Sequence, residues 1–240
     1  QIIFCEKLYY ICCNHYYYMK ISFTLFCLLT TLATSVFGQL AHQMKIKPED
    51  VAIAEKYKKE YPKENFVSLS TVATYTFNYS TKTKKVEAHL HYAETIMALK
   101  ENKVFSNVVW FDKQSDIVKI EGRNYKNKPA YIGSSKSDYA SAGIFYGDAK
   151  MFDYNFHLST RGDKTKYYYK KKYDDIKYLT AVFFHTHYPI KEKIIIFKIP
   201  TWLTLDFVEE NFNGYHIIKT EKIDEKKKIL TLRNPSIING

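Results

Sequence analysis

Apolar and polar residues alternate with a period of two through much of the chain. The clearest case is KIIIFKIPTWLTLDF, residues 193–207, where Pro200 interrupts the alternation before it resumes. This period is typical of strands with one buried face, and proline marks a strand end or a bulge because it cannot donate a ladder hydrogen bond. We therefore expect two strand segments, with Trp202 covering the end of their core. The expected core residues are Ile195, Phe197, Ile199, Leu203, Leu205 and Phe207.

The same period begins at Phe66 and predicts a hairpin. FVSLSTVATYTFNY, residues 66–79, is followed by the polar turn STKTKK and then by VEAHLHYAETIMAL, residues 86–99. Two alternating runs joined by a short polar turn predict an antiparallel pair. In the second run, one face carries Val86, Ala88, Leu90 and Tyr92, and the other carries Glu87, His89 and His91.

Further short strands are expected along the rest of the chain. Their ranges are 104–111, 115–120, 143–147, 151–159, 166–173, 203–210, 215–224 and 227–233. The run YDDIKYLTAVFFHTHYPI, residues 173–190, is ambiguous, because Asp174 or Asp175 could cap a short helix while YLTAVFF could form a strand. We interpret it as a turn plus a short strand. Strands spaced by about 8–12 residues predict an antiparallel β-sandwich, here as one domain over residues 63–234.

A helix is expected just before this domain. In KPEDVAIAEKYKKEYP, residues 47–62, Pro48 occupies a helix start, Glu49 and Asp50 follow in the first turn, and lysines lie near the end. Pro62 would stop the helix. The fold class expected for the whole chain is therefore mainly β, an antiparallel β-sandwich with one short N-terminal helix in a lead-in over residues 39–62.

The N-terminal region predicts export. Met19-Lys20 precedes the apolar run ISFTLFCLLTTL and the small-residue exit ATSVFG, which together are typical of a signal peptide over residues 19–38, cleaved after Gly38. The apolar run is too short to cross a hydrocarbon core of about 30 Å. We expect a periplasmic or secreted protein with no stable membrane anchor after cleavage. Residues 1–18 are interpreted as translation of DNA upstream of the true start, and residues 235–240 as a tail.

Composition narrows the chemistry. All four cysteines lie in the first 27 residues, so the expected mature chain has neither a disulfide framework nor a thiol nucleophile. The net charge of +11 is spread along the chain as lysine interleaved with Asp and Glu. We interpret this as a lysine-rich solvated surface and expect no nucleic-acid partner.

Two histidines are weak candidates for metal ligands. His185 and His187 form an HxH pair, whose rings would share one face of a strand in a geometry that zinc accepts. No cysteine follows residue 38 and no carboxylate stands at a zinc-site spacing, so the ligand count falls short. A metal-dependent hydrolase is thus the least favoured hypothesis, and no cofactor is expected.

The run KYYYKKKY, residues 166–173, interleaves aromatic rings with cations. Tyr167, Tyr169 and Lys171, together with Trp202, are the candidate ligand-binding residues, since such side chains can stack on ligands and hold anions. The favoured alternative is that lysines on an exposed edge strand prevent edge-to-edge aggregation. Arg161-Gly162-Asp163 is expected to be a turn between two strands.

The sequence contains no recognisable catalytic pattern. The sequence lacks GxSxG, GxGxxG and GxxxxGK[ST] motifs. The adjacent acids Asp174-Asp175 and Glu209-Glu210 would point to opposite faces of a strand, which does not suit an acid/base pair. We therefore expect no catalytic residue in this chain.

Several aromatic patterns resemble a known family. They are the YDDIKY entry, Tyr188-Pro189-Ile190, the FKIPTWL strand and the NFNGY turn, with VVWFD and GIFYGDAKMFDYNFHL upstream. In these the chain resembles the β-rich domain of unknown function at the N-terminus of exported bacterial transglutaminase-like proteins. The resemblance covers roughly residues 45–234 and is most specific over residues 173–216.

The resemblance implies a neighbour that this sequence does not contain. In that family a transglutaminase-like core with a Cys, His and Asp triad follows the β-rich domain, whereas this sequence stops at Gly240. We expect either a truncated reading frame or a stand-alone copy of the non-catalytic domain. The expected function is a scaffold or substrate-binding module beside a protease-like or peptide-modifying core. The alternative is a stand-alone peptide- or polysaccharide-binding module.

Overall fold

The computed structural model describes residues 46–139, 148–179, 181–212 and 215–235. The chain divides into two compact units, residues 1–46 and Lys47–Gly240, and the fold described below is that of the second unit. The predicted strand over residues 143–147, the signal peptide and the tail from residue 236 lie outside the described residues.

The second unit is built mainly from strands, as the sequence predicts. Its elements are α2 (Pro48–Glu60), β1 (Phe66–Ser80), β2 (Lys85–Ala98), β3 (Lys103–Phe111), β4 (Ser115–Asn124), β5 (Pro129–Ala130), β6 (Gly133–Asp138), β7 (Lys150–Leu158), β8 (Lys164–Tyr173), the 3-10 turn η1 (Ile176–Tyr178), β9 (Lys193–Pro200), β10 (Ile218–Ile223) and β11 (Lys227–Asn234). The mainly β class with a short helix near the N-terminus is therefore confirmed.

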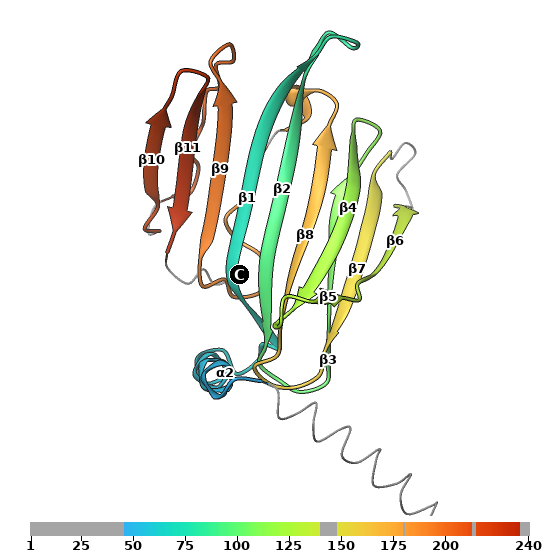
Figure 1. Cartoon of the computed structure of the whole chain (residues 1–240), viewed down its shortest axis with the longest axis vertical. Coiled ribbons are helices and arrows are strands. Elements are labelled where there is room, and N and C mark those ends of the chain that lie inside the picture. The colour runs from blue at the N-terminus through green and yellow to red at the C-terminus, as the bar shows by residue number, and fades with distance from the viewer. Residues whose placement is uncertain (1–45, 140–147, 180, 213–214, 236–240) are drawn as a thin grey trace, which may run out of the picture. The chain divides into compact units, whose positions relative to one another are not determined.

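Two sheets make up the sandwich (Figure 1). The large sheet has eight strands in the order β10-β11-β9-β1-β2-β8-β4-β5, and the small sheet has three in the order β3-β7-β6. Nearly all pairs are antiparallel, including the predicted β1/β2 hairpin, whose register runs from Phe66 opposite Ala98 to Ser80 opposite Lys85. The exception is β9, which runs parallel to β1 over Lys193–Lys198.

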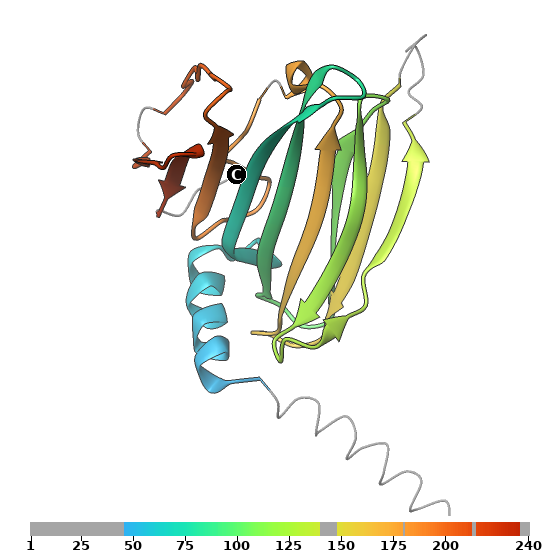
Figure 2. The same ribbon diagram turned by 45° about the horizontal axis from the view of Figure 1, so that its top comes forward.

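Helix α2 follows the capping pattern that its sequence predicts. Pro48 stands at its start, Glu49 and Asp50 lie in the first turn, and its last turn carries lysines, so the side-chain charges complement the helix dipole. Its buried residues Ala54 and Tyr57 pack against Val67, Met97 and Leu99 at the ends of β1 and β2. Figure 2 shows the helix beside these strand ends.

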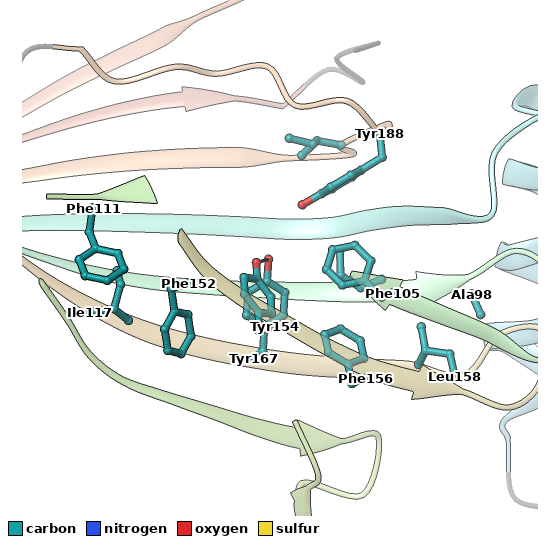
Figure 3. Packing of buried hydrophobic residues seen from close by; sticks show 12 residues of the cluster. Ala98, Phe105, Phe111, Ile117, Phe152, Tyr154, Phe156, Leu158, Tyr167 and Tyr188 are labelled. Atoms are coloured by element: carbon teal, nitrogen blue, oxygen red, sulfur yellow. Dashed lines mark hydrogen bonds between the residues drawn. The ribbon is translucent and has the colours of Figure 1, made fainter. Parts of the chain in front are cut away.

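One face of the large sheet carries two adjoining cores. The inter-sheet cluster lies between β2, β8 and β4 of the large sheet and β3 and β7 of the small one (Figure 3). The β9 cluster comes from β1, β2, β9 and β11, and its members are Ala73, Tyr75, Phe77, Ala88, Leu90, Ile195, Phe197, Ile199, Leu230 and Leu232. Tyr92 and Tyr169 pack against both clusters, so both clusters lie on the same face. The small sheet covers the first, and the irregular segments after β8 and β9 cover the second.

Two predicted strands are wrong. Residues 203–210 form no strand, and residues 181–190 contain only an isolated bridge between Ser68 and Ile190. Both edges of β9 are already paired, with β1 and β11, so no free edge next to it can accept residues 203–210. Leu203 and Leu205 instead pack against the β9 cluster as partly buried side chains, without ladder pairing. Asp175 caps η1 by accepting a hydrogen bond from the Lys177 amide.

The core predicted around Pro200 is confirmed in part. Pro200 ends β9, and Ile195, Phe197 and Ile199 are buried. Phe207 is 38% exposed, and Trp202 is 54% exposed in the turn after β9. The expectation that Trp202 covers the core is therefore wrong, because the turn at residues 201–202 directs the ring to solvent.

Candidate functional site

The tyrosines predicted as ligand contacts lie in the core. Strand β8 runs between β2 and β4, so the expectation that KYYYKKKY forms an exposed edge is wrong. Tyr167 is fully buried, and the Tyr169 ring stacks on Tyr92 with centroids 4.6 Å apart. Successive side chains of a strand point to opposite faces of the sheet, and the odd-numbered tyrosines of β8 lie on the face that packs in the core.

The Lys171 side chain is half-buried, and its ammonium group already contacts other residues of the protein. Its Nζ donates a hydrogen bond of 2.7 Å to the carbonyl oxygen of Trp110 and lies 4.5 Å from the centroid of the Tyr173 ring. Burial lowers the pKa of Lys171, against the smaller opposing effect of Asp112. The structure does not bring Lys171 and Trp202 together, since Trp202 lies in the turn after β9.

The histidine pair lies on irregular backbone rather than on a strand. The His185 ring contacts Phe183 edge-on at 5.4 Å, and the His187 ring contacts Tyr188 at 4.9 Å. Across the part of the chain that the structure describes, no group of three or more His, Cys, Asp and Glu side chains is placed to hold a metal ion. The same residues include no helix that is long and apolar enough to cross a membrane.

A buried carboxyl group, which the sequence analysis missed, stands at the centre of the inner face. Glu94 of β2 is 1% exposed and accepts hydrogen bonds from four hydroxyl groups. Tyr188 donates to both carboxyl oxygens at 3.0 Å, Tyr92 donates to Oε2 at 2.8 Å, and Thr71 donates to Oε1 at 3.1 Å. Tyr167 also donates to Oε2 and itself accepts a 2.9 Å hydrogen bond from Tyr154. We call Thr71, Tyr92, Glu94, Tyr167 and Tyr188 the Glu94 centre.

The Glu94 centre joins β1, β2 and β8 of the large sheet to the irregular segment after η1, and Tyr154 of β7 connects it to the small sheet through its hydrogen bond to Tyr167. Figure 3 shows the hydroxyl oxygens of Tyr154 and Tyr167 side by side, while Tyr188 extends from that segment toward the cluster. Burial raises the pKa of Tyr167 and Tyr188 well above the ordinary tyrosine value, and the nearby Glu94 carboxyl raises it further. The hydroxyl groups of the centre all donate to Glu94 inside the core, so they hold β1, β2, β8 and the segment after η1 together.

Lys193 shares the inner face with this centre. It is 6% exposed, and no hydrogen bond or ion pair of its ammonium group is found among the described residues. Burial lowers its pKa to about 8, although the charge of Glu94 acts in the opposite direction. Both groups had a signal in the sequence, because Glu94 is in phase with Leu90 and Tyr92, and Lys193 is in phase with Ile195.

An apolar pocket of about 710 Å³ lies over the β9 cluster. Its floor comes from β1, β9 and β11, and its walls come from the irregular segments on either side of β9. Phe77, Ile195, Phe197, Leu230 and Leu232 form the floor. The walls are Ile176, Leu179, Ala181, Val182, Phe183, Phe184, His185, Leu205, Asp206, Phe207, Val208, Glu209, Glu210, Asn211, Phe212, Tyr215 and Ile217. Its volume falls within the roughly 300–1,000 Å³ typical of ligand pockets.

Aromatic contacts shape the pocket. Phe207 packs on Phe197 with ring centroids 4.8 Å apart, and Phe184 meets Phe212 edge-on at 5.8 Å. Phe183 and Tyr215 remain 61% and 51% exposed at its edge. Of the predicted site residues, only His185 lines the pocket. Residues 205–210 of the predicted strand supply one wall because this segment does not join the sheet.

Comparisons with known proteins identify no family for this chain. No family model matches the sequence, and no curated protein matches it either. Among solved structures, a "putative protease" from Parabacteroides distasonis aligns over 73% of this chain and 36% of its own, with 9% identity and a TM-score of 0.46. An M1 zinc metallopeptidase from Deinococcus radiodurans aligns over 74% of this chain and 41% of its own, with 7% identity and a TM-score of 0.39.

A third solved structure is also similar to this chain. A "putative nutrient binding protein" from Legionella pneumophila aligns over 70% of this chain and 66% of its own, with 6% identity and a TM-score of 0.37. The present chain therefore spans less than two thirds of each of these three proteins.

Proposed function

We propose that this chain is an exported, non-catalytic β-sandwich domain that binds peptide segments for a transglutaminase-like protein. The observation that carries the proposal is the apolar pocket of about 710 Å³ over the β9 cluster. Burying large apolar side chains in such a pocket removes apolar surface from water at about 25 cal/mol per Å², which favours association. A scaffold role and a substrate-binding role both follow from the same surface.

The sequence resemblance supports this pocket as the binding site. The stretch most similar to the transglutaminase-like family, residues 173–216, supplies all of the pocket-lining residues except Phe77, Ile217, Leu230 and Leu232. It also supplies Tyr188, which the Glu94 centre holds in place. Of the features that carry the resemblance, the YDDIKY entry and the NFNGY turn contribute Ile176, Phe212 and Tyr215 to the pocket wall, and the FKIPTWL strand contributes Phe197 to its floor.

A polysaccharide is the alternative ligand. The half-exposed rings of Phe183 and Tyr215 at the pocket edge could stack on sugar rings as well as on peptide side chains. A peptide array and a glycan array, each probed with the purified protein, distinguish the two. The pocket-blocking variant is Ala181→Trp, which places a large ring at an exposed pocket-lining position and should not disturb the core.

The array outcome decides the proposal. Peptide spots that bind the wild type and lose signal with Ala181→Trp are the expected result. Signal confined to glycans would transfer the proposal to the stand-alone polysaccharide-binding module, and silence on both arrays would reject a binding role for the pocket. The proposed catalytic neighbour is tested separately, by reading the genomic DNA downstream for a transglutaminase-like frame with a Cys, His and Asp triad.

A further inference from the structure

The pocket differs in charge from the rest of the protein. The chain carries 36 Lys and Arg against 25 Asp and Glu, yet no Lys or Arg lines the pocket. Three acids line it instead, namely Asp206, Glu209 and Glu210. All three lie on the exposed segment that follows β9, close to the half-exposed ring of Phe207. The apolar cavity therefore has an acidic edge, although the chain as a whole has a net positive charge.

These acids are only partly neutralised by the protein itself. The Glu209 carboxylate forms an ion pair with Lys219 of β10, in which Oε1 and Nζ lie 2.9 Å apart. Within the described ranges, neither Asp206 nor Glu210 has an ion pair or a hydrogen bond to its side chain. Acids elsewhere on the large sheet are paired, as Glu87 is with Lys172 at 3.0 Å and Asp116 is with Lys136 at 2.6 Å. Two carboxylates at the pocket edge therefore remain available to a ligand.

We propose that the pocket binds an extended peptide segment in which large apolar side chains are flanked by lysine or arginine. This inference rests on the proposed function and specifies its ligand class. The apolar side chains fill the cavity above Phe197 and Phe207, and the flanking cations lie near Asp206 and Glu210. Complementary charges at an interface contribute more to specificity and to the association rate than to affinity.

The same charges disfavour other occupants. A fatty acid or another anionic amphiphile would bring its negative group toward the unpaired carboxylates of Asp206 and Glu210, where like charges repel. A neutral apolar peptide would gain the cavity contacts alone. A second copy of this chain would have to place one of its own exposed segments in the pocket, which would make the protein dimeric in a pocket-dependent way.

Three end-blocked peptides test the inference by calorimetric titration of the purified protein. Their sequences are Lys-Phe-Leu-Phe-Lys, Ser-Phe-Leu-Phe-Ser and Glu-Phe-Leu-Phe-Glu, which share one apolar centre and differ only in flanking charge. The lysine peptide should bind about three- to tenfold more tightly than the serine peptide, as expected for exposed ion pairs, and the glutamate peptide more weakly still. The preference should shrink as salt is raised.

Two paired variants locate the effect. Asp206→Asn with Glu210→Gln should bring the lysine peptide to the affinity of the serine peptide, while the melting temperature stays unchanged because both side chains are exposed. The matched control is Glu101→Gln with Glu225→Gln, which removes two exposed acids outside the pocket and should preserve the preference. Ala181→Trp should weaken all three peptides together.

Each remaining outcome counts against the inference. Equal binding of the three peptides that Ala181→Trp abolishes would overturn the charge preference while leaving peptide binding intact. Failure of all three to bind would remove the proposed function as well. Tighter binding of the glutamate peptide, tighter binding of dodecanoate than of the lysine peptide, or a dimer that Ala181→Trp dissociates would each assign the pocket to a different occupant.

Discussion

Lys193 and Glu94 lie in one row of the large sheet, on either side of Thr71. Thr71 pairs with Lys193 across β1 and β9, and with Glu94 across β1 and β2. Residues in register on paired strands point to the same face, so a buried ammonium and a buried carboxyl share the inner face of the sandwich. The carboxyl group has four hydroxyl donors, whereas the ammonium group relies on the more distant charge of Glu94.

Removing the Glu94 carboxyl should destabilise the fold strongly. Glu94→Ala leaves three tyrosine hydroxyls and Thr71 without their acceptor in a buried site, and we expect a loss of roughly 3–5 kcal/mol in the free energy of unfolding. Glu94→Gln keeps the shape and one acceptor oxygen, and we expect a loss of about 1–3 kcal/mol. Denaturant unfolding measures both.

The control for Glu94 is on the same strand. Glu87 points to the outer face of β2 and pairs with Lys172, so Glu87→Gln should cost less than about 1 kcal/mol. If Glu94→Gln proves no more destabilising than Glu87→Gln, the hydrogen bonds of the Glu94 centre do not stabilise the fold.

Lys193 should make the protein more stable at mildly alkaline pH. Because its folded pKa of about 8 lies below the unfolded value of about 10.5, the unfolded chain binds the extra proton between these values, and stability rises with pH through that window. Below about pH 8 the full cost of burying the ammonium applies. Lys193→Met should therefore raise the free energy of unfolding at pH 7 by roughly 1–3 kcal/mol.

The pH dependence separates this effect from simple repacking. The advantage of Lys193→Met over the wild type should shrink between pH 7 and pH 10, as measured by urea unfolding at a series of pH values. An advantage that stays constant over this range would show that desolvation of the ammonium is not its cause.

The buried tyrosines should limit stability at still higher pH. Burial raises the pKa of Tyr92, Tyr167, Tyr169 and Tyr188 well above the ordinary value near 10. The unfolded chain then loses these protons first, so stability should fall as pH rises above about 10. Ultraviolet titration of tyrosinate should show exposed tyrosines ionising first and the buried set ionising together with unfolding. Gradual ionisation of all tyrosines without unfolding would contradict the buried set.

The turn Arg161-Gly162-Asp163 is structural as predicted, and its glycine should resist substitution. Gly162 has φ of +83°, and a Cβ there would lie 3.0 Å from the backbone of Asp50 and Val51 in α2. Gly162→Ala should cost roughly 1–3 kcal/mol, because an L side chain is strained at this φ and would press on the helix backbone. Arg161→Ala next to it should cost less than about 1 kcal/mol, and equal thermal shifts for the two variants would refute the contact with α2.

Period-two alternation predicts strands correctly where a free sheet edge exists, but it also predicts a strand at residues 203–207, which have no such edge. Residues 193–199 and 203–207 share the same alternation, yet only the first run forms a strand, because its neighbours β1 and β11 leave no free edge beside it for the second. Pairing depends on which edges remain free, and that depends on the whole sheet order.

The chemistry of the inner face could have been anticipated better than the pocket. A glutamate in phase with Leu90 and Tyr92, and a lysine in phase with Ile195, both signal buried ionisable groups. The pocket has no such signal, since it arises where residues 176–185 and 205–217 cross the sheet without filling the space above Phe197.

Peptide binding in the pocket over β9 and β11 is tested most directly by amide NMR of the protein titrated with Lys-Phe-Leu-Phe-Lys. We predict saturable shifts concentrated at residues 181–185, 195–197, 205–212 and 230–232, and their loss in Ala181→Trp. Shifts absent from these residues, or centred on α2 or on the small sheet, would contradict a binding site in this pocket.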